Sequence, residues 1–410
     1  MVFFTIDDLE KKVLEKIDSM RDELIKFHQD IVKIPSENPP GKYKPAGDFI
    51  QTKMDEIGLD TKNIRNNIVG NVYHEDGPSL ILYSHFDTVE AFKGWKHDPF
   101  GGEIEDGKIF GRGSADDKSS VTATIFATQA LLECGVNLKG RITLAAVNDE
   151  EMGGIKGARL LLEKGHIKGD ACLVGESFGE YPVAYFGGGI FMVIQIIGKI
   201  SHGMNFPDLA NYKNEYTGIS SIQKMVKVIN FLNELQIEFN KTESKYPNFN
   251  DMPARISHIN IGTIQGGNKI TTVPNRCVLT GSINTIPEQD VESIVRRIRE
   301  YVERFKKEDP ELNIQINIPI THEPQIMDTN TRLAQILRNS YKTIFNEERE
   351  FKFILTTTDS HYFQEYGIET FLIGAGTAEC NNHAADEFIK IEDLIKGTKV
   401  IALSALNYLR

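Results

Sequence analysis

Ser79-Leu80-Ile81-Leu82-Tyr83-Ser84-His85-Phe86-Asp87 is an apolar run of strand length that leads directly into a histidine and an aspartate two positions apart. Side chains at positions i and i+2 of a strand leave the same face, so His85 and Asp87 can contact one another or one ion. The alternative is a polar strand end capped by a turn. The rest of the chain decides between a metal site and such a turn.

The size and composition of the chain are those of a soluble, two-domain globular protein. Its 410 residues exceed the length at which a single hydrophobic core usually keeps growing. Hydrophobic residues make up 40% and charged residues 25%, which are ordinary values. The net charge of −12 argues against nucleic acid or an anionic membrane as a partner, because both attract basic surfaces.

Cysteine use and the absence of targeting segments favour a cytoplasmic protein. The four scattered cysteines contain no CxxC pair, which suggests neither a disulfide framework nor a thiolate zinc site. The N-terminus lacks the basic segment of a signal peptide. No apolar stretch nears the roughly 20 residues that a membrane span needs.

Hydrophobic periodicity predicts an α/β sheet covered on both faces in the first part of the chain. One amphipathic helix is expected over residues 6–34 and a second near 45–57. The expected strands are 67–73, 79–84 and 141–147. The later helices are expected over 117–134 and 155–164.

A second domain is expected to begin near residue 186, after the turn Gly187-Gly188-Gly189. The expected elements are strand 190–200, helix 213–236, strands 255–264 and 272–284, helix 288–307 and strand 312–319. This βαββαβ order is that of a ferredoxin-like sandwich. Helix and strand patterns then resume, ending in a helix over 391–409, so we predict a discontinuous catalytic domain (1–185 and 321–410) with residues 186–320 inserted.

Acidic residues and a second histidine recur where other predicted strands end. The candidates are Asp116 in the loop 111–118, Glu150 and Glu151 after strand 141–147, Glu176 after strand 171–174, and His383 after strand 371–373. Each motif alone could be helix capping or a solvated charge cluster. Because ligands collect at the carboxyl ends of strands in open α/β sheets, the repetition favours one shared site that includes His85.

Two imidazoles and several carboxylates, with no thiolate, suit zinc, cobalt or manganese in a hydrolytic site. Neighbouring residues on a strand point to opposite sides, so one of Glu150 and Glu151 can bind metal while the other moves protons. Three ligating carboxylates and two divalent ions leave one positive charge. A bridging hydroxide, which is a nucleophile at neutral pH, would neutralise it.

Taken together, these motifs resemble the co-catalytic zinc aminoacylase and carboxypeptidase family, especially its acetylornithine deacetylase and succinyl-diaminopimelate desuccinylase branch. The resemblance covers nearly the whole chain. It rests on Pro35–Gly41, His85–Asp87, Trp95, Asp98–Phe100, Gly111–Lys118, Asp149–Glu151, Gly175–Glu176, Gly198–His202, Gly266–Gly267 and His383–Glu387.

The resemblance implies a fold, an activity and an assembly. The fold is a phosphorylase/hydrolase-like mixed-sheet α/β catalytic domain with an inserted ferredoxin-like α+β lid or dimerisation domain. The activity is metal-dependent hydrolysis of an amide bond in a small N-acyl amino acid or peptide. The assembly is a homodimer formed through the inserted domain.

It also implies roles for individual residues. One metal would be bound by His85, Asp116 and Glu176, and the other by Asp116, Glu151 and His383, with Asp116 bridging the two. Asp87 would accept a hydrogen bond from the free nitrogen of His85, Glu150 would be the general base, and His202 would donate to the oxyanion. Relatives typically have a cis peptide between the positions of Asp116 and Asp117.

Three positions depart from the pattern of these relatives. Thr271 replaces an asparagine, and Asn284 and His361 replace arginines that read a substrate carboxylate. Because the planar fork of arginine has no substitute in asparagine or neutral histidine, we expect a dipeptide or an amide without the usual α-carboxylate as substrate. The alternatives are a non-catalytic metal-binding scaffold of the same fold and a two-metal phosphoesterase.

The six remaining histidines that lack companions at ligand spacing are expected at surface or turn positions: His28, His74, His97, His166, His258 and His322.

Overall fold

The computed structural model describes residues 7–73, 75–205, 216–249 and 255–410, and within them the chain forms two compact units. The first comprises the chain up to Ala184 together with Met327–Lys352 and Thr358–Arg410. The second comprises Tyr185–Ile326 and Phe353–Thr357. The expected class, an α/β unit with a second unit inserted in it, is confirmed. Among the described helices, none combines the length and apolar character needed to cross a membrane.

The expected single helix over 6–34 is wrong, because two helices occupy this segment. α1 (Asp8–Ser19) begins with a capping box between Asp7 and Glu10, and α2 (Arg21–Val32) follows after Met20. Met20 leaves helical geometry with φ −91° and ψ 7°, yet its side chain is buried. The break lets both helices bury their apolar stripes, and α3 (Lys44–Glu56) follows.

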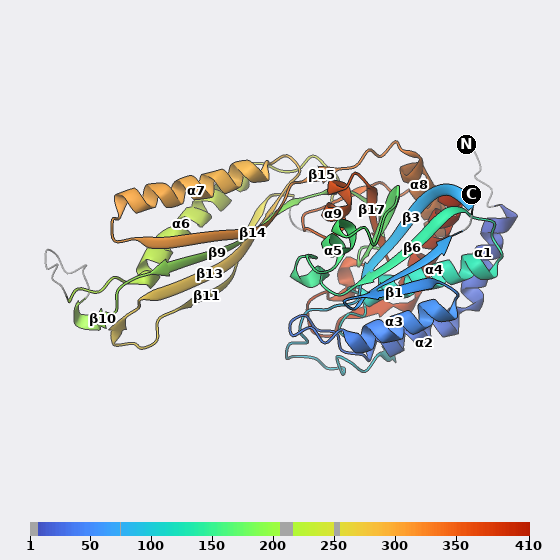
Figure 1. Ribbon diagram of the computed structural model, residues 1–410, viewed down its shortest axis with the longest axis horizontal. Helices are drawn as coiled ribbons and strands as arrows, with labels where there is room; N and C mark the ends of the chain where they lie inside the picture. Colours follow the sequence, from blue (N-terminus) through green and yellow to red (C-terminus); the bar gives the residue numbers. More distant parts are fainter. Residues whose placement is uncertain (1–6, 74, 206–215, 250–254) are drawn as a thin grey trace. The chain divides into compact units, whose positions relative to one another are not determined.

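A mixed sheet forms the centre of the first unit (Figure 1). β6, β3, β7 and β17 lie side by side in parallel, and β2 pairs antiparallel with β6. The sheet's strands within the first unit are β1 (Asp60–Ile64), β2 (Asn67–Tyr73), β3 (Glu75–His85), β6 (Lys139–Val147), β7 (Ala171–Glu176) and β17 (Glu369–Gly374). β8 (Val183–Phe186) and β16 (Lys352–Ile354) begin in the first unit and end in the second, and β15 (Gln325–Ile326) belongs to the second. The carboxyl ends of four parallel strands therefore meet at one edge.

Helices cover both faces of this sheet. Ile81 and Tyr83 of β3 belong to a core shared with α5 (Ala158–Glu163) and α9 (Ser360–Glu365). On the other face, α4 (Lys118–Glu133) and α10 (Ile391–Leu409) pack against β3 and against each other. The buried strands are held between two helical layers, as a parallel sheet requires.

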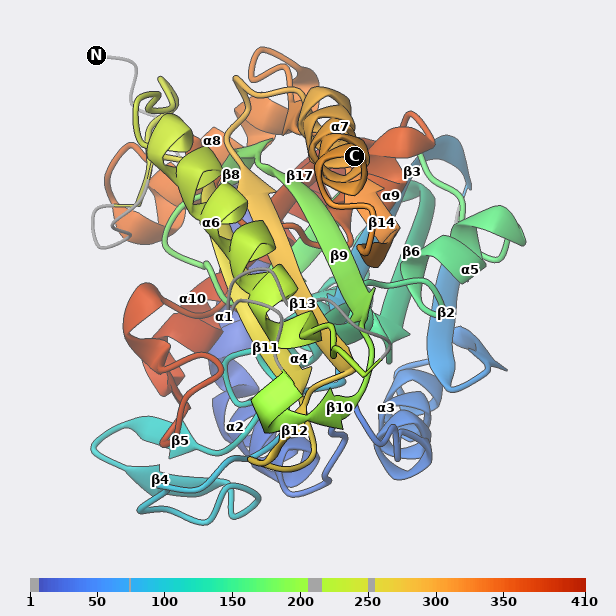
Figure 2. The ribbon, with the colours of Figure 1, turned by 90° about the vertical axis from the view of Figure 1, so that its left-hand side faces the viewer.

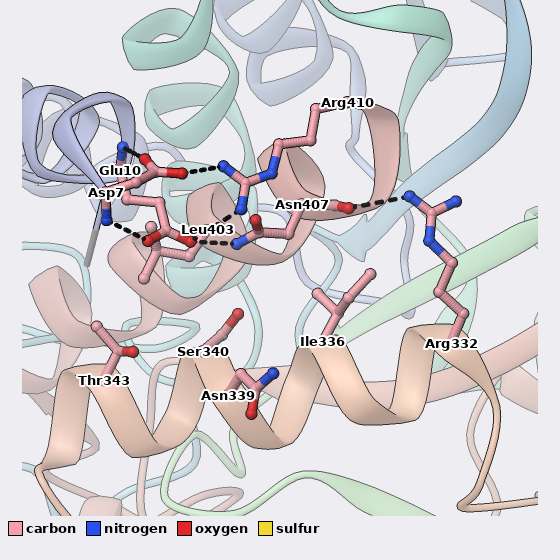
Figure 3. A pocket seen from close by; sticks show the side chains of 10 residues that line it. All are labelled: Asp7, Glu10, Arg332, Ile336, Asn339, Ser340, Thr343, Leu403, Asn407 and Arg410. Carbon is pink, nitrogen blue, oxygen red and sulfur yellow. Dashed lines mark hydrogen bonds and ion pairs between the residues drawn. The ribbon is translucent and has the colours of Figure 1, made fainter. Parts of the chain in front are cut away.

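A pocket of about 420 Å³ lies where α1 and α10 meet α8 (Arg332–Phe345) (Figure 3). Arg332 donates a hydrogen bond to the carbonyl of Asn407 at 3.2 Å, and the Asn407 amide donates to Glu10 at 2.8 Å. Arg410 forms an ion pair with Asp7. These contacts join the first and last helices of the described chain, and the residues lining the pocket are distinct from the candidate metal ligands.

The second unit is a four-stranded antiparallel sheet with two helices on one face (Figure 2). The strand order β11-β13-β9-β14 and the βαββαβ sequence of elements confirm the ferredoxin-like arrangement. Its elements are β9 (Gly188–Ile197), α6 (Ser221–Phe239), β11 (His258–Gly266), β13 (Arg276–Thr285), α7 (Val291–Glu308) and β14 (Asn313–His322). Residues 213–215 of the expected first helix lie outside the described residues, and the helix begins at Ser221.

Two pairs of short strands place functional segments. In the second unit, β10 (Ser201–His202) pairs with β12 (Thr272–Val273). In the first unit, β18 (Phe388–Lys390) pairs with β5 (Lys108–Phe110), which pairs with β4 (Glu103–Glu105). The β18–β5 pairing brings the segment that follows His383 beside the loop that carries Asp116.

Two histidines expected at surface or turn positions are buried, His28 in a helix and His322 at the end of a strand. His28 lies on the buried face of α2, where its Nε2 donates to the Ser114 carbonyl at 3.0 Å and its Nδ1 lies 3.0 Å from the Thr122 hydroxyl. Burial lowers the pKa of His28 to about 3. His322, at the end of β14, is also buried. His74 lies outside the described residues.

Candidate metal centre

Three parallel strands bring four of the candidate side chains to one edge of the sheet. His85 is the last residue of β3 and Glu176 the last residue of β7, and β3 lies between β6 and β7 in parallel register. Glu150 and Glu151 follow β6 in a single 3₁₀ turn, Glu150–Met152. The convergence expected from strand ends is therefore present in the fold.

Asp116 lies between two imidazoles. Its Oδ1 is 3.3 Å from Nε2 of His85, and its Oδ2 is 3.3 Å from Nε2 of His383. The same His383 nitrogen is 3.3 Å from Oε1 of Glu151. The peptide bond between Asp116 and Asp117 is cis.

These side chains form two groups that share Asp116. His85, Asp116 and Glu176 make up one group, and Asp116, Glu151 and His383 the other; in each group the potential ligand atoms lie within 4.8 Å of one another. Nε2 of His85 is buried without a well-oriented hydrogen-bond partner among the described residues. A nitrogen and carboxylate donor set with an unpartnered buried imidazole nitrogen fits a divalent cation such as zinc.

The pKa values of three of the clustered side chains are raised, so these side chains retain protons when no metal ion is bound. Burial raises the pKa of Glu176 well above its usual range. The carboxylates of Asp116 and Glu151 raise the pKa of His383 to about 10. Burial opposes protonation of His85, but the neighbouring carboxylates of Asp116 and Asp87 outweigh it and raise the His85 pKa well above its usual range. Because metal ligands must be deprotonated, cation binding would displace these protons.

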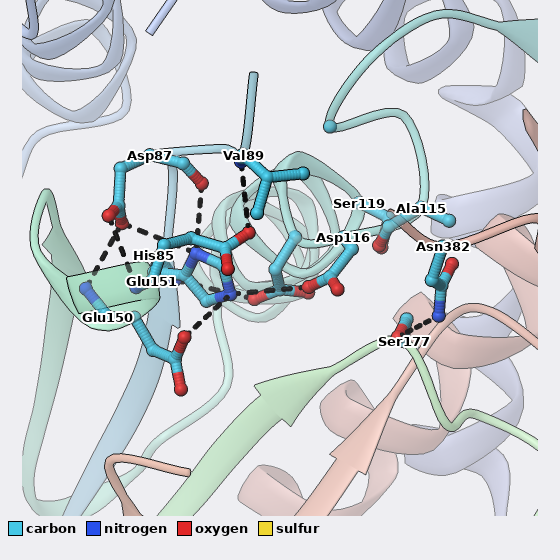
Figure 4. Close-up of polar contacts among 12 residues, drawn as sticks. His85, Asp87, Val89, Ala115, Asp116, Ser119, Glu150, Glu151, Ser177 and Asn382 are labelled. Atoms are coloured by element: carbon cyan, nitrogen blue, oxygen red, sulfur yellow. Dashed lines mark hydrogen bonds and ion pairs between the residues drawn. The ribbon is translucent and has the colours of Figure 1, made fainter. Parts of the chain in front are cut away.

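Glu150 and Glu151 diverge for a different reason from the one expected. They lie on a 3₁₀ turn and not on a strand, so strand alternation does not separate them. Glu151 reaches toward His383, whereas Oε2 of Glu150 lies 4.0 Å from Nε2 of His85 (Figure 4). Burial raises the pKa of Glu150 well above its usual range.

Asp87 contacts more than His85. Nδ1 of His85 makes its hydrogen bond with the backbone carbonyl of Asp87 at 3.1 Å, while the Asp87 carboxylate lies 3.4 Å away. The carboxylate accepts hydrogen bonds from the backbone N–H groups of Glu150 at 3.2 Å and Glu151 at 3.3 Å. The expected carboxylate–imidazole hydrogen bond is thus replaced by a carbonyl–imidazole one.

Sequence reasoning gave Asn38 no role, although it lies in the quoted Pro35–Gly41 motif. Its side-chain amide donates to Oδ2 of Asp87 at 2.9 Å. The backbone N–H of Asn38 also donates to the carbonyl of Thr88 at 2.8 Å. The only sequence signal for a role of Asn38 was its place before two prolines. Its partner Asp87 lies about fifty positions away, so the sequence did not indicate the contact.

Four further residues of interest belong to neither ligand group. His202 is in the second unit, where it is exposed in β10 and its Nδ1 accepts from the Met204 N–H at 3.3 Å. Thr271 and Asn284 are in the same unit. His361 is in α9 of the first unit, where it is fully buried with Nδ1 3.1 Å from the Thr358 carbonyl.

Comparison with known proteins identifies consistent relatives. The family model described as peptidase family M20/M25/M40 matches residues 81–407 of the chain. The chain is 28% identical over 416 residues to N-formyl-4-amino-5-aminomethyl-2-methylpyrimidine deformylase of Halalkalibacterium halodurans, covering 95% of each. It is 26% identical over 397 residues to a probable succinyl-diaminopimelate desuccinylase of Staphylococcus epidermidis, covering 89% of this chain and 93% of that one.

The solved structure of human carnosine dipeptidase 1 matches with a TM-score of 0.78 at 18% identity, covering 98% of this chain and 99% of that one. At that identity the match concerns the fold.

Proposed function

Because the chain belongs to peptidase family M20/M25/M40 and is a metallohydrolase of amide or peptide bonds, we propose that it cleaves a linear amide bond with two divalent ions. The observation that carries the proposal is the pair of ligand groups that share Asp116. The first ion would be held by His85, Asp116 and Glu176, and the second by Asp116, Glu151 and His383. Zinc, cobalt and manganese all suit these donors.

Two bound divalent ions supply activation of a water molecule and polarisation of the scissile carbonyl. The chain supplies the proton transfers. Glu150 takes a proton from the attacking water and delivers it to the leaving nitrogen, because its carboxylate faces the first ligand group and its pKa is raised by burial. Asp87 fixes the turn that carries Glu150 and the ring of His85. His202 is proposed as the donor to the oxyanion.

We propose that the substrate is an amide whose amine portion carries no carboxylate. His361, in place of a clamp arginine, is fully buried and offers no planar fork of donors. The deformylase relative is named for a formyl amide of an aminomethylpyrimidine, a name that contains no carboxylic acid. The desuccinylase relative is named for a dicarboxylic amino acid substrate, which is the competing possibility.

A substrate panel tests this proposal. Protein loaded with Zn²⁺, Co²⁺ or Mn²⁺ would be incubated with N-formyl aminomethylpyrimidine, N-acetylornithine, N-succinyl-diaminopimelate, unsubstituted dipeptides and an aryl phosphate. We expect the carboxylate-free amide to give the highest kcat/KM. Equal or faster turnover of acetylornithine would contradict the substrate class. Turnover of the aryl phosphate alone would favour the phosphoesterase, and metal binding with no turnover would favour the scaffold.

We further propose a homodimer formed through the second unit. In the described part of the chain, β11 pairs only with β13 and so presents a free edge. Apolar side chains stand exposed nearby in the same unit, with Ile264 of β11 at 50% and Val226 of α6 at 48% exposure. Strand edges of this kind pair readily with another chain. Light scattering coupled to size exclusion is expected to give twice the 46.1 kDa chain mass.

A further inference from the structure

The two ligand groups differ in what holds them. In the first group, His85 and Glu176 are the last residues of β3 and β7 and are fixed by the sheet. In the second group, Asp116 and His383 lie on loops and Glu151 on a 3₁₀ turn. The geometry of the second group therefore depends on contacts between loops.

A buried carboxylate supports the loop of Asp116. Glu387 is fully buried, and its Oε1 accepts hydrogen bonds from the backbone N–H groups of Ala115 at 2.9 Å and Asp116 at 3.0 Å. Its Oε2 accepts from the N–H of Gly113 at 3.2 Å. The Glu387 backbone is itself fixed, because its carbonyl accepts from the N–H of Gly111 at 2.9 Å, next to the β18–β5 pairing.

A buried guanidinium joins Glu387 to the loop of His383. Arg112, 1% exposed, forms an ion pair with Oε2 of Glu387. Its other terminal nitrogen donates to the carbonyl of Ala384, the residue after His383, at 3.1 Å. The guanidinium also lies 5.3 Å from the centre of the Trp95 ring. The backbone N–H of Arg112 donates to the Pro99 carbonyl at 2.8 Å.

We propose that Arg112 and Glu387 are positioning residues that set the separation of Asp116 and His383 and thereby the affinity of the second metal site. The pair contacts the backbone at Asp116 on one side and at Ala384 on the other, and it touches neither His85 nor Glu176 in any described contact. Asp116 belongs to both ligand groups and His383 to the second alone, so we expect the pair to affect the second group more strongly than the first. The inference rests on the proposed metal binding, but not on amide hydrolysis.

The test measures the two Zn²⁺ affinities separately in the full chain, by calorimetry in chelator-buffered metal and by Co²⁺ absorption spectra. Loss of residues that orient metal ligands typically weakens metal affinity about 10–100-fold. For Glu387→Gln we expect a loss of this size at one of the two sites and a clearly smaller loss at the other. The matched control is Asp309→Asn, which breaks the Lys224–Asp309 ion pair of the second unit and should leave both affinities unchanged.

Arg112→Lys is the second variant, in case Glu387→Gln does not fold. It keeps the charge but loses the fork that reaches both Glu387 and Ala384, so one site should again lose more affinity than the other. Equal weakening of both sites, or no change at either, would overturn the inference. Wild-type protein that binds two ions without hydrolysing any amide would contradict the proposed function and leave this inference standing.

Discussion

The side-chain amide of Asn38 donates a hydrogen bond to the carboxylate of Asp87 at 2.9 Å. The same carboxylate accepts the backbone N–H groups of Glu150 and Glu151. Asp87 therefore connects the Pro35–Gly41 segment, the imidazole of His85 and the turn that carries both glutamates. Its position explains why one side chain behind the ligands can influence proton transfer without binding an ion.

Asp87→Ala is expected to lower turnover sharply while substantial metal stays bound. The substitution leaves three buried donors without their acceptor, at about 1–3 kcal/mol each, and frees the turn that carries Glu150. Steady-state kinetics and elemental analysis of the same preparation measure both effects. Asn38→Ala removes one of these donors and should reduce turnover less. Loss of both ions from Asp87→Ala would contradict the separation of roles.

Gly154→Ala is expected to damage the turn that carries Glu150 and Glu151. Gly154 has φ +66°, and an added Cβ would lie 1.8 Å from Oδ1 of Asp359, which is buried. Gly135 is the matched control, since it has φ +62° and nothing within 4 Å of an added Cβ. Gly135→Ala should cost about 1–2 kcal/mol, the backbone strain alone. Gly154→Ala should cost more in chemical denaturation and also lower turnover; equal effects of the two would refute the clash.

The buried His28 should make the first unit sensitive to acid. Its pKa is about 3 in the folded protein and about 6.5 in an unfolded chain. Between these values the unfolded state binds more protons, so the free energy of unfolding falls as the pH drops from 6.5 toward 3. The slope from this group is up to about 1.4 kcal/mol per pH unit.

His28→Gln should therefore flatten the dependence of unfolding free energy on pH between pH 6 and pH 4. Exposed His166 provides the control, because His166→Gln should leave that slope unchanged. Parallel slopes for wild type and His28→Gln would show that His28 does not resist protonation in the folded state.

Long periodic segments were predictable from the sequence, and short ones were not. The strand expected over 67–73 and the helix expected over 391–409 have those bounds in the structure. No glycine or proline lies at the break between α1 and α2 at Met20, so the sequence carries no local sign of it. We attribute the break to the packing of both apolar stripes. β4, β5 and β18 have three residues each, too few to show a period of two. His28 follows Leu24 by four positions, a helical spacing that placed it on the buried face.

The candidate ligands were predictable because each lies at the end of a strand or in the segment after one, and the fold brings strand ends together. The contacts that hold them were not, since Asn38 reaches Asp87 and Arg112 reaches Glu387 across long stretches of chain. Hydrogen bonds to loop backbone have no periodicity in the sequence. Strand alternation predicted that Glu150 and Glu151 point in different directions, but the 3₁₀ turn produces their divergence.

The most direct test of the two-metal hydrolase compares wild type with Glu150→Gln at equal metal content. Both proteins would be loaded with Zn²⁺, checked for two ions per chain by mass spectrometry, and assayed on the amide that wild type cleaves fastest. We predict that Glu150→Gln keeps both ions and loses about 10²–10⁴-fold in kcat, the usual contribution of general acid–base catalysis. Unchanged kcat in Glu150→Gln with both ions bound would contradict the account.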